Sequence, residues 1–508
     1  MTQSVSPLLL DGASLEAEGL VNAAGSGGQV SIAPASLDAM AASRDVILQA
    51  IAERTPIYGV TTGLGSRAGE ALSLAELSDF SLQTLRGRAH ASGPPLPAAI
   101  VRAAMIVRLN SLLSGAAGAS PEMAHGLAAA VNANVTPVVG RIGSLGASDL
   151  LLGATMGLAL CGEGTMSDAA GNVAPAADTL ARAGLSPLRP GPRDGLALCS
   201  HDAFSAASAA FALVASRRAL AAVEMATALS FEAFRANISI LRKDVLALCP
   251  QPGEDTAGAN IRRWLEGSSL MQPGAARRLQ DPLSFRNAVQ GHGAAHHFHD
   301  ILERIVTVRI NGAPDNPVVL VDTGEVVSSG NFFTPHLTIA LEAVSRALCM
   351  VAALQTARIA RLLSEKFSGL AMFLSPGSAS PNGFAPLLKI AESLLSSMAA
   401  RAAASLIWPS GNADGVEDAM TQSLQAAHNL TDVVEGLERI CAVELMVAAQ
   451  AIELRGTAGD LTPRLAAVLA HIRSISPALG HDRALGAELD AMAAAIGQGG
   501  FAALAARS

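Results

Sequence analysis

The amino-acid sequence predicts a mainly α-helical protein built around a long central helical bundle. Half of its 508 residues are apolar and only 15% are charged, so the chain can bury a large core. Two stretches, Pro335 to Phe367 and Leu437 to Leu454, contain helix-forming residues and are apolar on most faces. Such helices must be covered on several sides, which indicates a bundle completed by other subunits.

The elements that precede the bundle are shorter. Val30 to Ile32 is strand-like, and a helix is expected to begin with Ser36 as its capping residue. Apolar residues at helical spacing predict further helices within residues 97–138, 203–245 and 256–279.

Composition and charge exclude several classes of partner. The net charge of −8 is mild and the arginines are scattered, so we expect no nucleic-acid partner. No run of about 18 uninterrupted apolar residues occurs, and the N-terminus lacks a basic segment before an apolar one, so no membrane contact is expected. Five dispersed cysteines without a CxxC pair suit free thiols in a reducing compartment. These features predict a cytoplasmic protein.

The stretch from Gly143 to Gly164 is the candidate reaction centre. A loop rich in small residues leads into an apolar helix from Leu150 to Cys161, and Ser148 or Asp149 can cap that helix. A helix start concentrates N–H groups and the positive end of the helix dipole, so it can stabilise negative charge that develops nearby. The alternative interpretation is a plain buried helix with an aspartate at its start.

The order of residues in this loop resembles the histidine and aromatic amino acid ammonia-lyase family, whose loop reads Gly-Ser-x-Gly-Ala-Ser-Gly-Asp-Leu. In that family the Ala-Ser-Gly tripeptide condenses into an electrophilic methylideneimidazolone. The matching residues here are Ala147, Ser148 and Asp149, but the glycine that closes the ring is missing. We therefore expect no such cofactor, with cyclisation of these three residues as the alternative.

Three residues are expected to carry catalysis. The segment Ile57 to Gly65 resembles the family's Tyr-Gly-x-x-Thr-Gly-x-Gly, which implies that Tyr58, on a mobile lid, is the base at the substrate β-carbon. Ser410 to Asp418 resembles Ser-x-Asn-Gln-Glu-Asp, which implies a site carboxylate at Glu417, with Asp414 as the alternative.

Lys389 is the third catalytic candidate. It follows an Asn-Gly-Phe motif in the segment that begins at Pro381 and lies in an otherwise apolar helical stretch, which is unusual for an amine unless it is paired or functional. We expect it to bind the substrate carboxylate or to donate a proton.

Other motifs imply substrate contacts. Arg286, in a segment resembling Gln-Asp-x-Tyr-x-x-Arg, is expected to clamp the α-carboxylate, although Leu283 replaces the family's tyrosine. His90 is expected on a helix ending at Gly93, where it contacts the substrate ring. Asn311 is expected to contact the substrate, while Asp315 and Asn316 build a turn.

The segment around Ser200 departs from the family pattern. Ser200 replaces an asparagine that supports the cofactor, and His201 and Asp202 follow it, either as substrate-binding residues or as part of a helix cap. We also expect Asp149 or Asp202 to balance a cationic group of the substrate.

A histidine cluster invites a metal interpretation, because His292 and His296 are four residues apart and share a helix face. No complete ligand shell accompanies this cluster, which also includes His297 and His299. We therefore expect no metal and predict a surface or inter-subunit helix.

Together these features predict a carbon–nitrogen lyase. Its functional loops lie in residues 1–200, and residues 201–508 hold the bundle core and the C-terminal helices. We expect it to release trimethylamine from a histidine-derived betaine such as ergothioneine, giving a urocanate-type product. The alternatives are an ammonia-lyase with its cofactor and a non-catalytic relative. The resemblance implies a homotetramer with sites shared between subunits.

Overall fold

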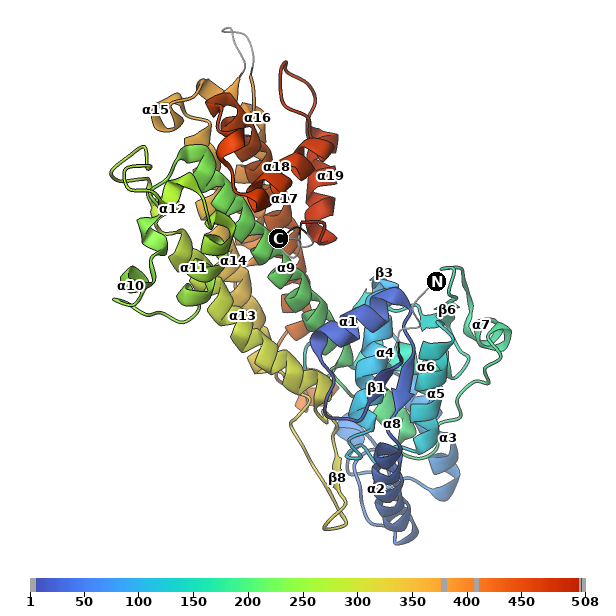
Figure 1. Cartoon of the computed structure of the whole chain (residues 1–508). Helices are drawn as coiled ribbons and strands as arrows, with labels where there is room; N and C mark the ends of the chain where they lie inside the picture. The colour runs from blue at the N-terminus through green and yellow to red at the C-terminus, as the bar shows by residue number, and fades with distance from the viewer. Residues whose placement is uncertain (1–5, 376–381, 406–410, 502–503, 505–508) are drawn as a thin grey trace. The chain divides into compact units, whose positions relative to one another are not determined.

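The structure is a computed structural model that describes residues 6–375, 382–405, 411–501 and 504 (Figure 1). Pro381 and Ser410, which begin two of the motifs above, lie outside the described residues. The described chain is mainly α-helical, which confirms the predicted fold class. Its residues form two compact units, each assembled from three segments of the sequence.

The first unit contains residues 1–214, 303–339 and 405–427, and the second contains residues 215–302, 340–404 and 428–508. The sequence suggested two consecutive parts, whereas each unit of the structure combines three separate segments of the chain. Four long helices contribute residues to both units: α9 (Ala203–Phe234), α13 (Ala288–Asn311), α14 (Pro335–Leu362) and α17 (Ser423–Arg455).

The first unit is a helical cluster edged by short strands. Its own helices are α1 (Ala17–Ser26), α2 (Pro34–Ala52), α3 (Leu74–Arg86), α4 (Ala98–Leu112), α5 (Pro121–Asn132), α6 (Leu150–Leu160), α7 (Ala176–Arg182) and α8 (Asp194–Cys199). Helices α4, α5 and α6 lie side by side, and α6 also packs on α3 and α8 (Figure 1). Because a Cβ at Gly153 would lie 2.6 Å from the Cys199 carbonyl oxygen, this glycine permits the close approach of α6 and α8.

Within the described residues, the strands form four small sheets, all in the first unit. A parallel pair joins β1 (Leu8–Leu10) and β2 (Val30–Ile32), and antiparallel pairs join β3 (Ser92–Pro95) to β5 (Gly140–Ile142) and β8 (Val318–Leu320) to β9 (Glu325–Val327). The fourth sheet has the order β4 (Thr136–Pro137), β6 (Thr165–Ser167), β7 (Val173–Pro175).

The second unit is a helical bundle. Its own helices are α10 (Lys243–Leu246), α11 (Glu254–Leu265), α12 (Leu283–Arg286), α15 (Glu365–Ser368), α16 (Ala385–Arg401), α18 (Pro463–Ile475) and α19 (Gly486–Gly497). They accompany the parts of the four long helices that belong to this unit.

A buried ion pair ties the long helices of the second unit together. The guanidinium of Arg358 on α14 donates to the carboxylate of Glu444 on α17, with Nε–Oε1 2.6 Å and Nη2–Oε2 3.1 Å, and both side chains are fully buried. Arg358 Nη2 also donates to Thr227 Oγ1 on α9 at 2.9 Å, and Ser230 Oγ donates to Glu444 Oε1 at 2.8 Å. The network therefore satisfies both charges in the bundle core.

Several predicted helices exist but have different ends. The helix expected from Ser36 begins at Pro34, because a proline at the first helical turn needs no N–H partner. The helix expected to end at Gly93 ends at Arg86, and the residues from Ser92 onward pair as strand β3 instead. The stretch expected from Leu437 is the second half of α17, which begins at Ser423.

Within the described residues, two helical stretches are long and apolar enough to cross a membrane by length and composition, Asp194–Phe234 and Pro335–Leu362. More than half of the apolar window in each is buried inside the protein, as in core helices.

Candidate functional site

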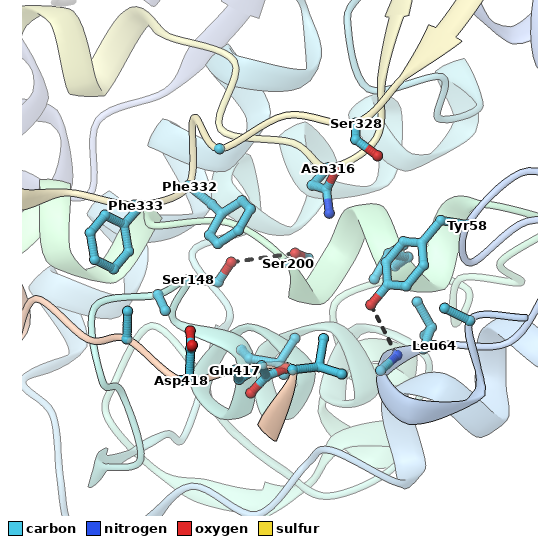
Figure 2. Close-up of a pocket in the computed structure, with 18 of the residues that line it drawn as sticks. Tyr58, Leu64, Ser148, Ser200, Asn316, Ser328, Phe332, Phe333, Glu417 and Asp418 are labelled. Carbon is cyan, nitrogen blue, oxygen red and sulfur yellow. Dashed lines mark hydrogen bonds between the residues drawn. The ribbon is translucent and has the colours of Figure 1, made fainter. Parts of the chain in front are cut away.

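A cavity of about 640 Å³ in the first unit brings together segments that are far apart in the sequence (Figure 2). Tyr58, Ser148, Ser200, Asn316 and Glu417 all contribute to its lining. The remaining lining is largely apolar and includes Leu64, Leu150, Leu196, Phe332, Phe333 and Val416. A mostly apolar cavity with a few convergent polar groups is the usual form of a small-molecule site.

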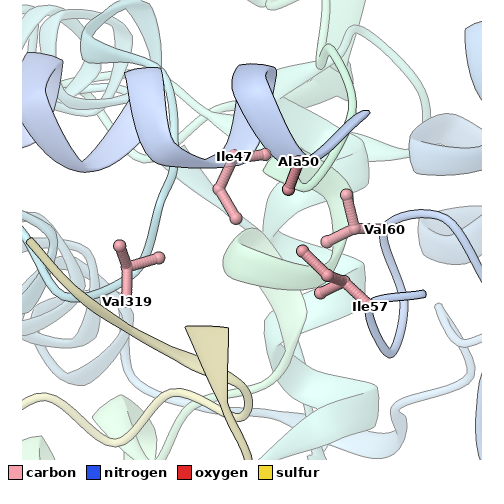
Figure 3. Packing of buried hydrophobic residues seen from close by; sticks show 5 residues of the cluster. All are labelled: Ile47, Ala50, Ile57, Val60 and Val319. Atoms are coloured by element: carbon pink, nitrogen blue, oxygen red, sulfur yellow. The ribbon is translucent and has the colours of Figure 1, made fainter. Parts of the chain in front are cut away.

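The loop that carries Tyr58 is anchored on both sides of the tyrosine. Ile57 and Val60 are buried against Ile47, Ala50 and Val319 (Figure 3). These anchors hold the backbone of the loop, while the Tyr58 side chain lines the cavity.

The phenol oxygen of Tyr58 has a specific partner. The backbone N–H of Gly65 donates to Tyr58 Oη at 3.0 Å (Figure 2). An N–H donor at a phenol oxygen stabilises negative charge on that oxygen, so the loop suits a tyrosine that acts as a base. Gly59, next to the tyrosine, has φ +65°, and a Cβ there would lie 2.5 Å from a methyl carbon of Leu196, so this position of the loop requires a glycine.

Ser148 and Ser200 form a hydroxyl pair in the wall of the cavity, with an Oγ–Oγ distance of 3.3 Å (Figure 2). Ser148 has φ +69°, a left-handed backbone conformation that is costly for a residue with a side chain. Its N–H donates to the Phe332 carbonyl at 3.4 Å, and Ala147 forms a bridge with Phe333. The reaction loop and the Phe332 segment therefore hold each other in place.

Asp149 precedes α6 but does not cap it through its side chain. Its buried carboxylate accepts from Ser144 Oγ at 2.6 Å, from the Ser205 N–H at 2.7 Å and from Ser205 Oγ at 2.8 Å. Ser205 lies in the first turn of α9, so Asp149 caps α9 instead. Burial raises the pKa of Asp149 to about 6, although these hydrogen bonds oppose the shift.

His201 and Asp202 are occupied by protein partners and do not line the cavity. His201 Nδ1 accepts from the Ala203 N–H at 3.2 Å and Nε2 lies 3.1 Å from the Leu198 carbonyl oxygen; burial lowers the pKa of this imidazole well below its usual value. Asp202 is buried and accepts from Arg309 Nε at 2.6 Å. The structure therefore places neither Asp149 nor Asp202, the carboxylates expected to balance a substrate cation, in the lining of the cavity.

Asn316, expected only to build a turn, lines the cavity, whereas Asn311 does not. Asn311 Oδ1 accepts from the Leu15 N–H at 2.8 Å and its Nδ2 donates to the Leu15 carbonyl at 2.8 Å. Asn110 Nδ2 donates to the same Asn311 oxygen at 3.0 Å, so this amide serves the fold.

The amide of Asn316 is oriented toward the cavity. Its Oδ1 accepts from the Ser329 N–H at 3.0 Å, and its Nδ2 points into the space between Tyr58 and Phe332 (Figure 2). The preceding residue, Asp315, forms a buried bidentate pair with Arg108, with distances of 2.8 and 3.1 Å, and thereby fixes the turn. The amide nitrogen of Asn316 is thus placed to donate to a ligand.

The acidic side of the cavity comes from Glu417 and Asp418. The Glu417 N–H donates to the Asn412 carbonyl at 3.1 Å, next to a short 3₁₀ turn at Ala413–Gly415. Asp414, the alternative site carboxylate, is exposed and does not line the cavity. Placement in the cavity therefore favours Glu417.

Three other predicted site residues lie elsewhere. His90 is exposed and does not line the cavity, although Arg88, two residues earlier, does. Lys389 is exposed on α16 in the second unit. Arg286, at the end of α12, lines a separate cavity of about 240 Å³ in the second unit, where its buried Nε has no partner among the described residues.

The histidine cluster lies on α13 and does not face solvent throughout, as a surface helix would. His292 is fully buried, and His299, also buried, places Nε2 2.7 Å from Ser216 Oγ. His296 Nε2 lies 2.7 Å from Glu224 Oε1. In the part of the chain that the structure describes, no group of three or more His, Cys, Asp or Glu side chains is placed to hold a metal ion.

Comparisons with known proteins agree on one family. A family model described as aromatic amino acid lyase matches residues 15–474. The chain is 32% identical over 506 residues to a histidine ammonia-lyase of Anaeromyxobacter sp. (strain K), covering 97% of this chain and 99% of that protein.

Two solved structures share the fold over nearly the whole chain. Ergothionase from Treponema denticola, in complex with desmethyl-ergothioneine sulfonic acid, is 27% identical with a TM-score of 0.93, covering 98% of this chain and 99% of that one. Histidine ammonia-lyase from Trypanosoma cruzi is also 27% identical, with a TM-score of 0.91, covering 98% of this chain and 95% of that one.

Proposed function

Because this chain belongs to the aromatic amino acid lyase family, and is thus a carbon–nitrogen lyase acting on a small molecule, we propose that it releases trimethylamine from a histidine-derived betaine. Ergothioneine, the betaine that carries sulfur on its imidazole ring, is the favoured substrate, and the product is then a thiol-bearing urocanate. The proposal includes the absence of a methylideneimidazolone cofactor.

The surroundings of Asp149 carry the proposal. For the ring to form, the Asp149 nitrogen would have to attack the Ala147 carbonyl, but its N–H donates to the His201 carbonyl at 2.6 Å. The Asp149 carboxylate is at the same time bound to Ser205, at the start of α9. Cyclisation would have to break these contacts, so residues 147–149 do not fit a self-made ring.

A betaine does not need that ring. Ammonia leaves poorly, and an electrophile assists it by bonding to the nitrogen lone pair. A quaternary nitrogen has no lone pair and already departs as a neutral tertiary amine. When Tyr58 takes the β-proton, the C–H electron pair forms the carbon–carbon double bond and the C–N electron pair leaves with trimethylamine.

The remaining roles follow from the cavity lining. Glu417 and Asp418 face the trimethylammonium group or an imidazole N–H, and the Ser148–Ser200 hydroxyl pair replaces the electrophile as a polar wall.

Arg286 and Lys389 belong to the second unit, and we propose that they reach the site from other subunits of a homotetramer. Leu279 and Leu283, two apolar residues close to Arg286 in the sequence, are exposed. Their exposure supports the proposal that another subunit covers this surface. We place the tetramer in the cytoplasm.

A product assay tests the proposal. Histidine, its trimethylated betaine and ergothioneine are incubated separately with the full-length protein, and trimethylamine, ammonia and the urocanate chromophore are measured. We expect trimethylamine from a betaine and little or no ammonia from histidine. Equal turnover of histidine and the betaine would contradict the proposal.

The intact mass of the protein distinguishes the cofactor-free proposal from the alternative, an ammonia-lyase that forms its own cofactor. We expect the mass of the unmodified sequence, because ring formation from residues 147–149 would expel two waters and lower the mass by about 36 Da. The lower mass, together with ammonia release from histidine, would identify an ordinary histidine ammonia-lyase, the function named for the Anaeromyxobacter relative.

The Asn316→Ala substitution should weaken turnover rather than folding. Its Nδ2 donates to no described residue and points into the cavity, so its loss removes one substrate hydrogen bond. We expect kcat/KM to fall roughly tenfold, the effect of about 1.4 kcal/mol. The matched control is Asn311→Ala, which should lower the melting temperature because Leu15 loses both of its partners. If instead Asn311→Ala lowered kcat/KM and Asn316→Ala lowered the melting temperature, Asn311 would be the substrate contact.

A further inference from the structure

We propose that Arg88 is the anion-binding residue that the first unit itself supplies to the cavity, and that it holds a negatively charged group of the substrate while Glu417 and Asp418 face the cation. The inference rests on the proposed function, because it assigns the charged ends of a zwitterionic substrate. Arg88 is the one arginine or lysine among the described residues that line the cavity, and Glu417 and Asp418 are the two carboxylates.

The position of Arg88 is fixed by its backbone. It lies in the turn that follows α3, where the Arg88 N–H donates to the Leu85 carbonyl at 3.1 Å. Gly87 caps α3, and its N–H donates to the Gln83 carbonyl. The turn therefore presents Arg88 to the cavity while His90 remains outside it.

The guanidinium of Arg88 is largely unused by the protein. Its side chain makes one long hydrogen bond, from Nη1 to the Thr84 carbonyl at 3.4 Å. Among the described residues it forms no ion pair, and neither Glu417 nor Asp418 forms one. A guanidinium offers five donors in a planar fork, so most of these donors are available to a ligand.

Opposite charges that line one cavity without pairing favour a dipolar ligand. A betaine has a permanent cation and an anion, and each can replace the water around the complementary side chain. These attractions strengthen as the bound ligand excludes water, because the local dielectric falls. A cavity of this charge pattern would bind a simple cation or a neutral ring less well than a zwitterion.

Two groups of an ergothioneine-like substrate can be the anion. The α-carboxylate and the ring sulfur, in its thiolate form, are both acceptors that a guanidinium fork can hold. The shared chemistry is a compact anionic acceptor, and the choice between the two is made by experiment.

Binding of two partial ligands to the full-length protein tests the inference. Urocanate carries the carboxylate without sulfur, and 2-mercaptoimidazole carries the sulfur without a carboxylate. Isothermal titration with the Arg88→Gln variant should show at least tenfold weaker binding of one of these probes, and the affected probe identifies the group held. Arg88→Lys, which keeps the charge but loses the fork, should give an intermediate loss.

Arg86→Gln is the matched control. Arg86 lies two residues away and pairs with Glu163 on the surface, where both side chains are about two-fifths exposed. This variant should bind both probes as the unmodified protein does.

Several outcomes overturn the inference. Unchanged binding of both probes by Arg88→Gln would do so, as would failure of the unmodified protein to bind either probe. An equal loss in Arg86→Gln would show a general charge effect instead. Because these are binding measurements without turnover, loss of probe binding in Arg88→Gln together with no trimethylamine release from any betaine would retain Arg88 as an anion site and reject the proposed reaction.

Discussion

Replacing Tyr58 with phenylalanine is expected to lower kcat for betaine elimination by roughly 100- to 10,000-fold, the usual contribution of a positioned general base. The substitution keeps the ring in the cavity wall but removes the oxygen to which the Gly65 N–H donates. The rate is measured as trimethylamine release at saturating substrate.

One further measurement, product binding, distinguishes a catalytic role of Tyr58 from a structural one. Product binding by Tyr58→Phe should stay within about threefold of the unmodified protein, because Ile57 and Val60 still anchor the loop. A loss of product binding equal to the loss in kcat would show that the phenol supports the pocket and does not act as the base. An unchanged kcat would remove Tyr58 from the mechanism altogether.

Removing one partner of the buried Arg358–Glu444 pair is expected to cause the largest loss of stability. Glu444→Ala leaves a fully buried guanidinium without its carboxylate, which costs about 3–5 kcal/mol of unfolding free energy. The double variant Arg358→Met/Glu444→Leu should recover most of that loss, because neither charge then remains buried. Chemical denaturation of the single and double variants measures both effects.

The control for the ion pair is a surface pair in the same unit. Arg401 Nε lies 3.1 Å from Asp432 Oδ2, and the side chains are 53% and 44% exposed. Asp432→Ala should therefore change stability by less than about 1 kcal/mol. If Glu444→Ala costs no more than Asp432→Ala, the buried network does not stabilise the bundle as described.

The order of motifs allowed much of the site to be predicted from the sequence. Tyr58, Ser148, Ser200 and Glu417 are separated by long stretches of chain, and all four line one cavity. A motif places a segment of backbone at the site. It does not specify which of two neighbouring side chains faces the ligand.

That limit explains the errors among neighbouring residues. His201 follows Ser200 directly, yet its imidazole is buried against its own backbone segment, where the Ala203 N–H and the Leu198 carbonyl use both ring nitrogens. Asn316, five residues after Asn311, faces the cavity because Ser329 holds its oxygen and leaves its nitrogen available. Such choices depend on which backbone groups the fold brings within hydrogen-bond distance of each side chain, and a motif does not specify them.

Helix existence was predictable in the same way, while helix ends were not. The apolar spacing of α4, α5 and α14 indicated helices because it reflects the buried face of each element. Arg88 was missed for a related reason. A single arginine in a polar turn carries no pattern, and its place in the cavity depends on the packing of α3 beside α8.

The anchoring of Asp149 has a consequence for the evolution of this chain. A point substitution cannot restore the full Ala-Ser-Gly-Asp order, because one residue is absent from the loop. Asp149→Gly would recreate the tripeptide but would remove the carboxylate that accepts from Ser205. Inserting a glycine after Ser148 would separate either the Asp149 carboxylate from Ser205 or its N–H from His201, and so disturb the start of α9. Under the proposed cofactor-free reaction, variants on the way back to a ring-forming loop would therefore be destabilised. Descendants of this chain would then diversify readily only among substrates whose nitrogen departs unaided.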